Sequence, residues 1–119
     1  MDGIKKLYHM KKKFLQISNN LIKNSLNKSE LAFIFRTKIH TILVFQIFGS
    51  EKITFEDLCK NLNSVASRTT IQSILVDGVN KDYLSKEVDK KDKRKKYYNC
   101  NNLKDTLQRW YMNNKSIFN

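Results

Sequence analysis

The stretch DKKDKRKKYYNC, residues 89–100, decides how the C-terminal half of this chain folds. Six cations surround Asp92, and two tyrosines, an asparagine and a cysteine follow them directly. Aromatic residues favour β-strands, whereas a run of charged residues is typical of a solvated turn or a disordered segment. The stretch is therefore a disordered basic tail, a solvated loop, or the tip and returning strand of a hairpin.

The residues on both sides of this stretch favour the hairpin. A partly alternating segment precedes it, and the segment NNLKDTLQRWYM, residues 101–112, follows it with an asparagine cap and an apolar helical stripe. The alternating residues are Tyr83, Leu84, Lys86 and Val88, and the stripe is Leu103, Leu107, Trp110 and Tyr111. A disordered tail would not lead into a new helix, so we predict a hairpin over about residues 84–100 and a C-terminal helix over residues 101–116.

Length and composition predict one small basic domain covering residues 1–119. A chain of 119 residues that is 40% hydrophobic and 11% aromatic can bury one core. The 23 Lys and Arg against 11 Asp and Glu give a net charge of +12, which favours a polyanionic partner, with nucleic acid first. The alternative is that the lysines keep the protein in solution or reflect the coding bias of an AT-rich genome.

The reactive side chains do not form the pattern of a catalytic or metal site. Cys59 and Cys100 lie far apart, and His9 and His40 are isolated. The neighbouring acids Glu56 and Asp57 fall in the first turn of a predicted helix, where carboxylates favour the helix dipole. We therefore expect a reduced, cytoplasmic protein that is not an enzyme and binds no metal or cofactor.

No membrane or export segment is expected. The N-terminus is basic but has neither an uninterrupted apolar core nor a small-residue cleavage site. The apolar run over residues 39–48 has about half of the ~20 residues that a membrane span needs. It reads as a buried helix.

The N-terminal segment, residues 1–28, predicts an amphipathic helix. Its apolar residues alternate at spacings of three and four, as in a coiled-coil seam. They are Leu7, Met10, Phe14, Ile17 and Leu21, and Ile4, Leu15, Ile22 and Leu26 widen the stripe. The helix lies either on its own domain or against another chain. We favour the second, because so wide a stripe needs more core than one small domain supplies.

The central segment predicts one long helix at the start of a core formed by residues 30–100. Ser29 is a candidate N-cap, and Gly49 is a candidate stop. The residues between them are apolar in almost every direction toward the C-terminal end. A helix that is apolar all round is buried centrally, so we expect this helix, residues 30–48, to be the hub of the core.

The segment after the central helix predicts a helix-turn-helix. A capping box of Thr54 and Asp57 opens a short helix that runs to Leu62, and a polar turn leads to a second helix over about residues 67–77. The buried residues of this second helix are Val65, Ile71, Ile74 and Leu75, and the outward residues are Ser67, Arg68, Thr69, Thr70, Gln72 and Ser73. Arginine can contact guanine, glutamine can contact adenine, and Ser or Thr can contact a base or a phosphate. An ordinary solvated helix face is the alternative.

Two motifs in this order resemble the MarR-type winged helix-turn-helix transcriptional regulators. TTIQSIL, residues 69–75, is similar to the recognition helix of that family, and DKR, residues 92–94, is similar to the Asp-x-Arg of its wing. The resemblance covers roughly residues 30–110. It implies a mainly α protein with a small β-hairpin, whose N- and C-terminal helices interlock in a homodimer.

The resemblance also implies roles for individual residues. Asp92 would stabilise the wing, and Arg94 would enter the minor groove, where a narrow A-tract attracts a guanidinium group. Phosphate contacts would come from Lys90, Lys91, Lys93, Lys95 and Lys96. Dimer contacts would come from Leu7, Met10, Phe14, Ile17, Leu21, Leu107, Trp110 and Tyr111. No set of residues identifies a small-molecule effector.

These expectations favour a sequence-specific regulator that binds double-stranded DNA, with residues 67–77 in the major groove and residues 84–100 on the minor groove and backbone. A winged helix that binds RNA or a protein partner is the main alternative. A small basic nuclease is a second alternative, but the sequence lacks the carboxylate cluster that would hold its divalent metal.

Overall fold

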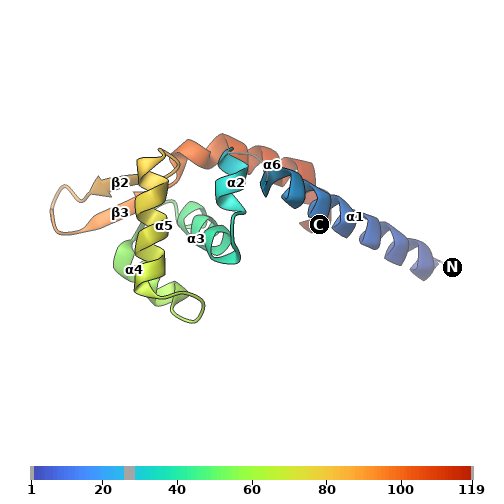
Figure 1. Ribbon diagram of the computed structural model, residues 1–119, viewed down its shortest axis with the longest axis horizontal. Helices are drawn as coiled ribbons and strands as arrows, with labels where there is room; N and C mark the ends of the chain where they lie inside the picture. The colour runs from blue at the N-terminus through green and yellow to red at the C-terminus, as the bar shows by residue number, and fades with distance from the viewer. Residues whose placement is uncertain (1, 26–28, 119) are drawn as a thin grey trace.

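The computed structural model describes residues 2–25 and 29–118, which form helices and one small antiparallel sheet (Figure 1). The helices are α1 (Asp2–Ser25), α2 (Glu30–Ile34), α3 (Lys38–Gly49), α4 (Phe55–Leu62), α5 (Arg68–Asn80) and α6 (Lys104–Phe118), with a 3₁₀ turn η1 (Asn101–Leu103) before α6. The strands are β1 (Ile53–Thr54), β2 (Ser85–Val88) and β3 (Lys96–Asn99). The mainly helical fold with a hairpin is confirmed.

Helix α3 lies at the centre of the core, as the all-round apolar sequence predicts. Leu43, Val44 and Ile47 have no exposed surface. Residues from every other element except α1 and β2 pack around them, among them Phe33, Ile34, Leu58, Leu62, Ile71, Leu75, Leu84, Tyr98, Leu103 and Leu107. One continuous core therefore joins the helices to the sheet.

The single helix predicted over residues 30–48 is wrong, because the chain breaks between α2 and α3. Thr37 begins the new helix: its side-chain oxygen accepts a hydrogen bond from the His40 backbone N–H at 3.2 Å. The Thr41 hydroxyl donates to the Ile34 carbonyl at 2.8 Å and satisfies the end of α2. A threonine that caps a helix competes with continuous helical hydrogen bonding, and here the cap prevails.

The hairpin predicted over residues 84–100 is confirmed as strands β2 and β3. Lys86 pairs with Tyr98, and Val88 pairs with Lys96 across an antiparallel ladder. Strand β1 adds a third strand on the other side of β3, with Ile53 opposite Tyr98. The hairpin is therefore anchored to the core by a central strand that is paired on both sides.

Helix α5 begins near the predicted residue but extends further. Ser67 is its N-cap, and the helix runs to Asn80 rather than ending at residue 77. Val65 does not belong to its buried face, because it lies in the preceding turn and is 43% exposed. The buried face consists of Ile71, Ile74, Leu75 and Gly78.

The start of the C-terminal helix also differs from the expected asparagine cap. Neither Asn101 nor Asn102 caps α6, because both lie in η1. The Asn99 side-chain oxygen instead accepts a hydrogen bond from the Asn101 N–H at 3.2 Å, and Asn102 donates from Nδ2 to the Asp82 carbonyl at 2.8 Å. The turn thus ties the end of β3 to the loop after α5.

Helix α1 extends away from the core (Figure 1). The molecule measures 61 × 27 × 24 Å, and its radius of gyration is 16.8 Å. A compact domain of this length has a radius of gyration of about 13.5 Å. The predicted N-terminal helix is confirmed over residues 2–25, and residues 26–28 lie outside the described part of the chain. None of the described helices is long and apolar enough to cross a membrane.

Candidate nucleic-acid interface

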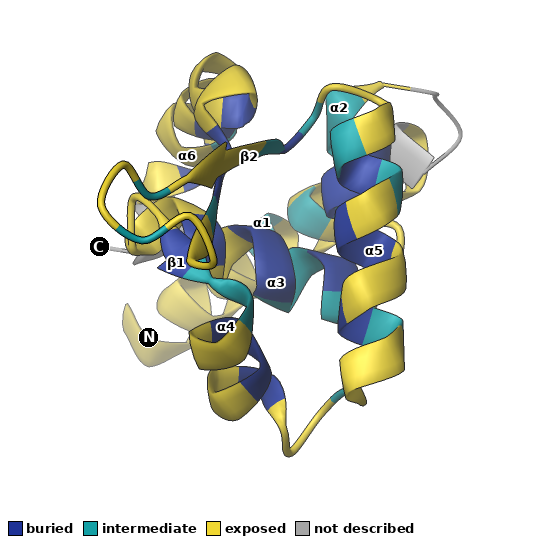
Figure 2. Ribbon diagram, turned by 90° about the vertical axis from the view of Figure 1, so that its left-hand side faces the viewer, coloured by how far each residue is buried: buried dark blue, intermediate teal, exposed yellow. Residues whose placement is uncertain are grey.

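Helix α5 presents a continuous exposed stripe opposite its buried face (Figure 2). Its residues recur at the spacing of one helix face, while Ile71, Ile74 and Leu75 pack into the core. The stripe consists of Thr69, Gln72, Ser73, Val76 and Asn80. Thr69, Gln72 and Ser73 were predicted from the sequence. Val76 and Asn80 were not, although they continue the same spacing toward the C-terminal end.

Ser67 and Thr70 are engaged in the cap of α5. The Ser67 side-chain oxygen accepts a hydrogen bond from the Thr70 N–H at 3.1 Å. The same hydroxyl lies 3.0 Å from the Thr70 hydroxyl, to which it donates. These two predicted contact residues therefore lie at the helix start, beside the stripe rather than on it.

Arg68 is the one basic residue within α5, and its guanidinium group is paired with Glu56. Nη2 and Nη1 of Arg68 donate to the two carboxylate oxygens of Glu56 at 2.8 and 3.0 Å. The guanidinium carbon also lies 5.0 Å from the centre of the Phe55 ring. The hydrogen bond and the charge of Arg68 lower the pKa of Glu56, and those of Glu56 raise the pKa of Arg68. The pair joins the start of α4 to the start of α5.

Gly78 and the segment before β2 form the joint between α5 and the hairpin. The Gly78 carbonyl accepts hydrogen bonds from the Tyr83 and Leu84 N–H groups at 2.9 and 3.1 Å. Leu84, which is buried, packs over the glycine, and Phe33 closes the other side. Because glycine has no side chain, Leu84 can approach residue 78 closely. This contact fixes the hairpin against the C-terminal end of α5.

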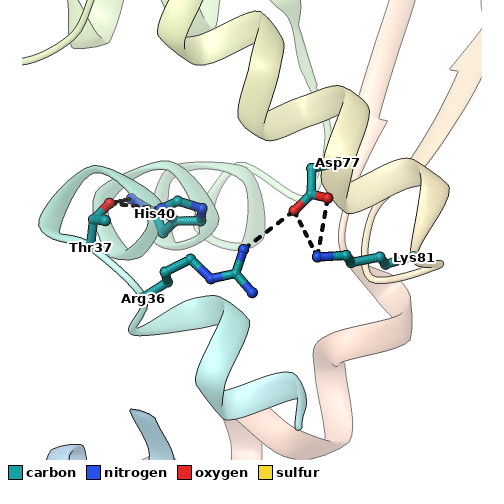
Figure 3. Close-up of polar contacts among 5 residues, drawn as sticks. All are labelled: Arg36, Thr37, His40, Asp77 and Lys81. Atoms are coloured by element: carbon teal, nitrogen blue, oxygen red, sulfur yellow. Dashed lines mark hydrogen bonds and ion pairs between the residues drawn. The ribbon is translucent and has the colours of Figure 1, made fainter. Parts of the chain in front are cut away.

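A charged cluster fastens the C-terminal half of α5 to the junction between α2 and α3 (Figure 3). Asp77 lies 3.7 Å from Arg36 and 3.1 Å from Lys81. Beside this cluster, Nδ1 of the buried His40 lies 2.7 Å from the Thr37 hydroxyl. Desolvation by burial lowers the pKa of His40, and the positive charge of Arg36 lowers it further.

Two aspartates shape the tip of the hairpin. One oxygen of Asp89 accepts hydrogen bonds from the Lys91 and Asp92 N–H groups at 2.8 and 3.3 Å. These two backbone hydrogen bonds lower the pKa of Asp89. Asp92 in turn accepts from the Arg94 N–H at 3.1 Å, and Arg94 Nε lies 3.4 Å from the same oxygen. Sequence reasoning assigned a bracing role to Asp92 and missed Asp89, although Asx turns are typical of this residue type.

The cations of the tip point into solvent. The Arg94 side chain is 94% exposed despite its contact with Asp92. Five exposed lysines surround it: Lys90, Lys91, Lys93, Lys95 and Lys96. Within the described part of the chain, none of the five lysines forms an ion pair. Their positive charge is therefore available to a polyanion.

The base of the hairpin is held by a second polar group. Glu87 accepts a hydrogen bond from Asn99 Nδ2 at 3.0 Å and pairs with Lys52 at 3.3 Å. The Lys52 ammonium also lies 4.8 Å from the centre of the Tyr97 ring. These contacts connect both strands to the loop before β1, so the tip projects from a supported base.

The hairpin tip and the stripe of α5 lie at the same end of the molecule, away from the N-terminus of α1 (Figures 1 and 2). In Figure 2, which views that end directly, the hairpin turn lies to one side and α5 to the other. One extended polyanion can therefore meet both elements without rearrangement of the chain.

The residues predicted as dimer contacts differ in how far they are exposed. Leu7, Met10 and Phe14 are exposed on α1, where Phe14 is 61% exposed. Ile17 and Leu21 are half-buried, and Tyr111 is exposed on α6. Leu107 differs from the expectation, because it is buried in the core of its own chain. Trp110 packs against Phe35 and Phe45, with ring centres 5.3 and 5.9 Å away.

Among residues 2–25 and 29–118, no three His, Cys, Asp or Glu side chains gather as metal ligands would. Both cysteines are buried, and burial raises the pKa of each thiol, that of Cys100 to about 12. No protein-family profile, curated protein or solved structure matches this chain.

Proposed function

We propose that this protein is a cytoplasmic transcriptional regulator of the winged helix-turn-helix type that binds double-stranded DNA in a sequence-specific manner. Helices α4 and α5 form the helix-turn-helix, and β2 and β3 form the wing. Helix α5 enters the major groove, which admits an α-helix, while the wing lies on the adjacent minor groove and backbone.

The joint at Gly78 is the observation that carries the proposal. It couples an uncharged polar stripe to a tip whose five lysines form no ion pair within the described part of the chain, so one ligand can meet both elements at a fixed separation. Double-stranded DNA offers matching features, since it carries base edges in its grooves and a regular line of phosphates beside them. The five tip lysines contact phosphates, Arg94 enters the minor groove, and the stripe of α5 reads bases.

A second copy of the chain completes the binding unit. The exposed apolar side chains of Leu7, Met10 and Phe14 lie on a helix that extends beyond the core, and Tyr111 and Met112 are exposed on α6. Such a surface is stable in water when another apolar surface covers it. A two-fold pair of chains would cover it and would place two α5 helices over successive half-sites.

We also propose that the protein binds DNA without catalysing a reaction. The acidic residues near the interface have structural partners: Glu56 pairs with Arg68, Glu87 pairs with Lys52, and Asp89 caps the hairpin turn. A carboxylate that coordinates a metal needs free oxygens directed at a common point. The arrangement supports recognition rather than hydrolysis.

A salt titration tests DNA binding directly. The affinity of a fluorescent duplex for the wild-type chain is measured by anisotropy at several salt concentrations. About five phosphate contacts predict a slope of about −4.5 in a plot of log affinity against log salt concentration. Lys93→Ala, which removes one phosphate contact, should reduce that slope by about one, whereas Arg94→Ala, which removes the minor-groove contact, should weaken binding about tenfold.

Lys11→Ala serves as the matched control, because it also removes one exposed positive charge but lies on α1. It should leave affinity and slope almost unchanged. Single-stranded and double-stranded RNA are titrated in parallel. Absence of duplex DNA binding in dilute buffer, or tighter binding of RNA, would contradict the proposal and favour the RNA or protein-partner alternative.

A further inference from the structure

We infer that the base pairs read by α5 are A·T pairs, with Val76 against the methyl group of thymine and Gln72 on the edge of adenine. The inference rests on the proposed function and specifies the DNA that the site takes. It follows from the chemistry of the exposed stripe, which contains hydroxyl, amide and aliphatic groups and no cation.

Guanine lacks a suitable partner on this stripe. The commonest specific contact to guanine is a bidentate arginine or lysine on its O6 and N7 atoms. Arg68, the one basic residue of α5, already donates both terminal nitrogens to Glu56 and lies over the Phe55 ring. Its guanidinium group is therefore directed at α4, to the side of the stripe.

Adenine has a partner in Gln72. A glutamine amide donates to N7 and accepts from the N6 amino group of adenine, which no other base presents in that order in the major groove. Gln72 is exposed, and within the described part of the chain its side chain forms no hydrogen bond with another residue. Both hydrogen-bonding ends of the amide are therefore available to a base.

Thymine has a partner in Val76. This valine is 47% exposed within an otherwise polar stripe, so much of its branched apolar side chain faces solvent. The thymine methyl group is the one apolar group that the major groove displays. Contact between them removes both from water, which is the usual reason for an aliphatic side chain at a base-reading position.

The spacing of the two residues fits adjacent base pairs. Gln72 and Val76 are four residues apart on one face, about 6 Å along the helix axis. Successive base pairs are 3.4 Å apart along each strand. The two side chains therefore reach bases within about two steps of each other, and an A·T-rich core of each half-site satisfies both.

Base analogues test this inference separately from DNA binding itself. Bound sites are first selected from a random duplex pool with the full chain. Each thymine of the selected site is then replaced by uracil, which removes the major-groove methyl group and leaves the minor groove unaltered. Affinity should fall about fourfold at one or two positions, which corresponds to the burial of one methyl group.

The Val76→Ala variant should bind the thymine duplex with an affinity that is lower by a similar factor. Uracil at those positions should cause no further loss of affinity in this variant. Val65→Ala is the matched control, because this exposed valine lies in the turn before α5. The Val65→Ala variant should show the same ratio of affinities for the thymine and uracil duplexes as the wild-type chain. Replacing adenine by 7-deazaadenine removes the N7 acceptor. This replacement should weaken DNA binding by the wild-type chain and leave the affinity of the Gln72→Ala variant unchanged.

The outcomes are distinct. Selection of G·C pairs at the centre of each half-site, or binding that is insensitive to uracil at every position, overturns the inference and leaves DNA binding intact. Loss of the uracil effect in Val65→Ala but not in Val76→Ala also overturns it. Failure of the full chain to bind any duplex overturns both the inference and the proposed function.

Discussion

Leu84 lies so close to Gly78 that a Cβ atom at residue 78 would stand 2.6 Å from Leu84 Cδ1. This contact joins the C-terminal half of α5 to the residue directly before β2. The backbone reinforces it, because the Gly78 carbonyl accepts hydrogen bonds from both Tyr83 and Leu84. The joint therefore fixes where the hairpin lies relative to α5, and the geometry of the proposed interface depends on it.

Replacing Gly78 by alanine should destabilise the fold although alanine is the better helix former. The helix propensity gain is about 1 kcal/mol, whereas overpacking a closed core costs about 1–3 kcal/mol. Leu84 and Phe33 are both buried and cannot move away freely. We expect the free energy of unfolding, measured by urea denaturation, to fall by up to about 2 kcal/mol.

Gly49→Ala is the control for this experiment, because nothing lies within 4 Å of a Cβ at that residue. It should have little effect or stabilise the protein slightly. Combining Gly78→Ala with Leu84→Ala should cost less than the sum of the single changes, since the smaller side chain relieves the contact. Additive costs would show that residues 78 and 84 are not in contact.

Releasing Arg68 from Glu56 should change base preference rather than stability. Glu56→Gln removes the carboxylate charge that orients the guanidinium group. Both side chains are exposed, so the melting temperature should hardly change. The freed arginine can reach guanine, and the affinity ratio between an A·T duplex and its G·C-substituted version should decrease.

Adding Arg68→Ala to the Glu56→Gln variant separates this mechanism from a general charge effect. The double variant has no guanidinium group to redirect, so the original base preference should return. A ratio that stays constant in both variants would show that Glu56 does not restrain base reading by Arg68.

Acidification should destabilise the protein through His40. Its pKa is lowered by burial and by Arg36, so the unfolded chain binds the proton more readily than the folded chain. The stability that this group contributes is present above the unfolded histidine pKa of about 6.5 and is lost as pH falls through the folded pKa. Urea midpoints between pH 7.5 and pH 5.5 should decrease, and His40→Gln should flatten that decrease.

A steeper slope in His40→Gln than in the wild-type chain would contradict this assignment.

The apolar face of α1 predicts a dimer that a charge disrupts. Phe14→Glu places a carboxylate on the exposed stripe of Leu7, Met10 and Phe14, where a paired chain would bury it. Sedimentation equilibrium should show a two-chain mass for the wild-type protein and the 14.1 kDa of one chain for the variant. Gln16→Glu, on the opposite face of α1, should keep the two-chain mass. A wild-type mass of one chain would contradict the paired arrangement.

Local sequence patterns predicted most helices and the hairpin. The spacing of apolar residues, the helix caps and the turn residues each depend on only a few neighbouring residues. The Thr54 cap, the Ser29 cap and the alternation before residue 89 are of this kind. The break after α2 was missed because the apolar run masks it. The signal was Thr37, a good capping residue within a run of helix-compatible ones.

The contacts that shape the candidate interface could not be derived in the same way. Glu56 and Arg68 are twelve residues apart, and their pairing depends on how α4 and α5 pack. The role of Gly78 depends on Leu84 and Phe33 approaching it from two other parts of the fold. Val76 was overlooked because an aliphatic residue on a polar face looks like core until the burial of its neighbours is known.

Amide chemical shifts of the isotope-labelled chain, recorded as a selected duplex is added, test most directly whether α5 and the hairpin tip contact one DNA. We predict that resonances of residues 68–76 and 89–96 shift together and saturate at the same duplex concentration. Changes confined to one of these segments, or to the face of α1, would contradict the account.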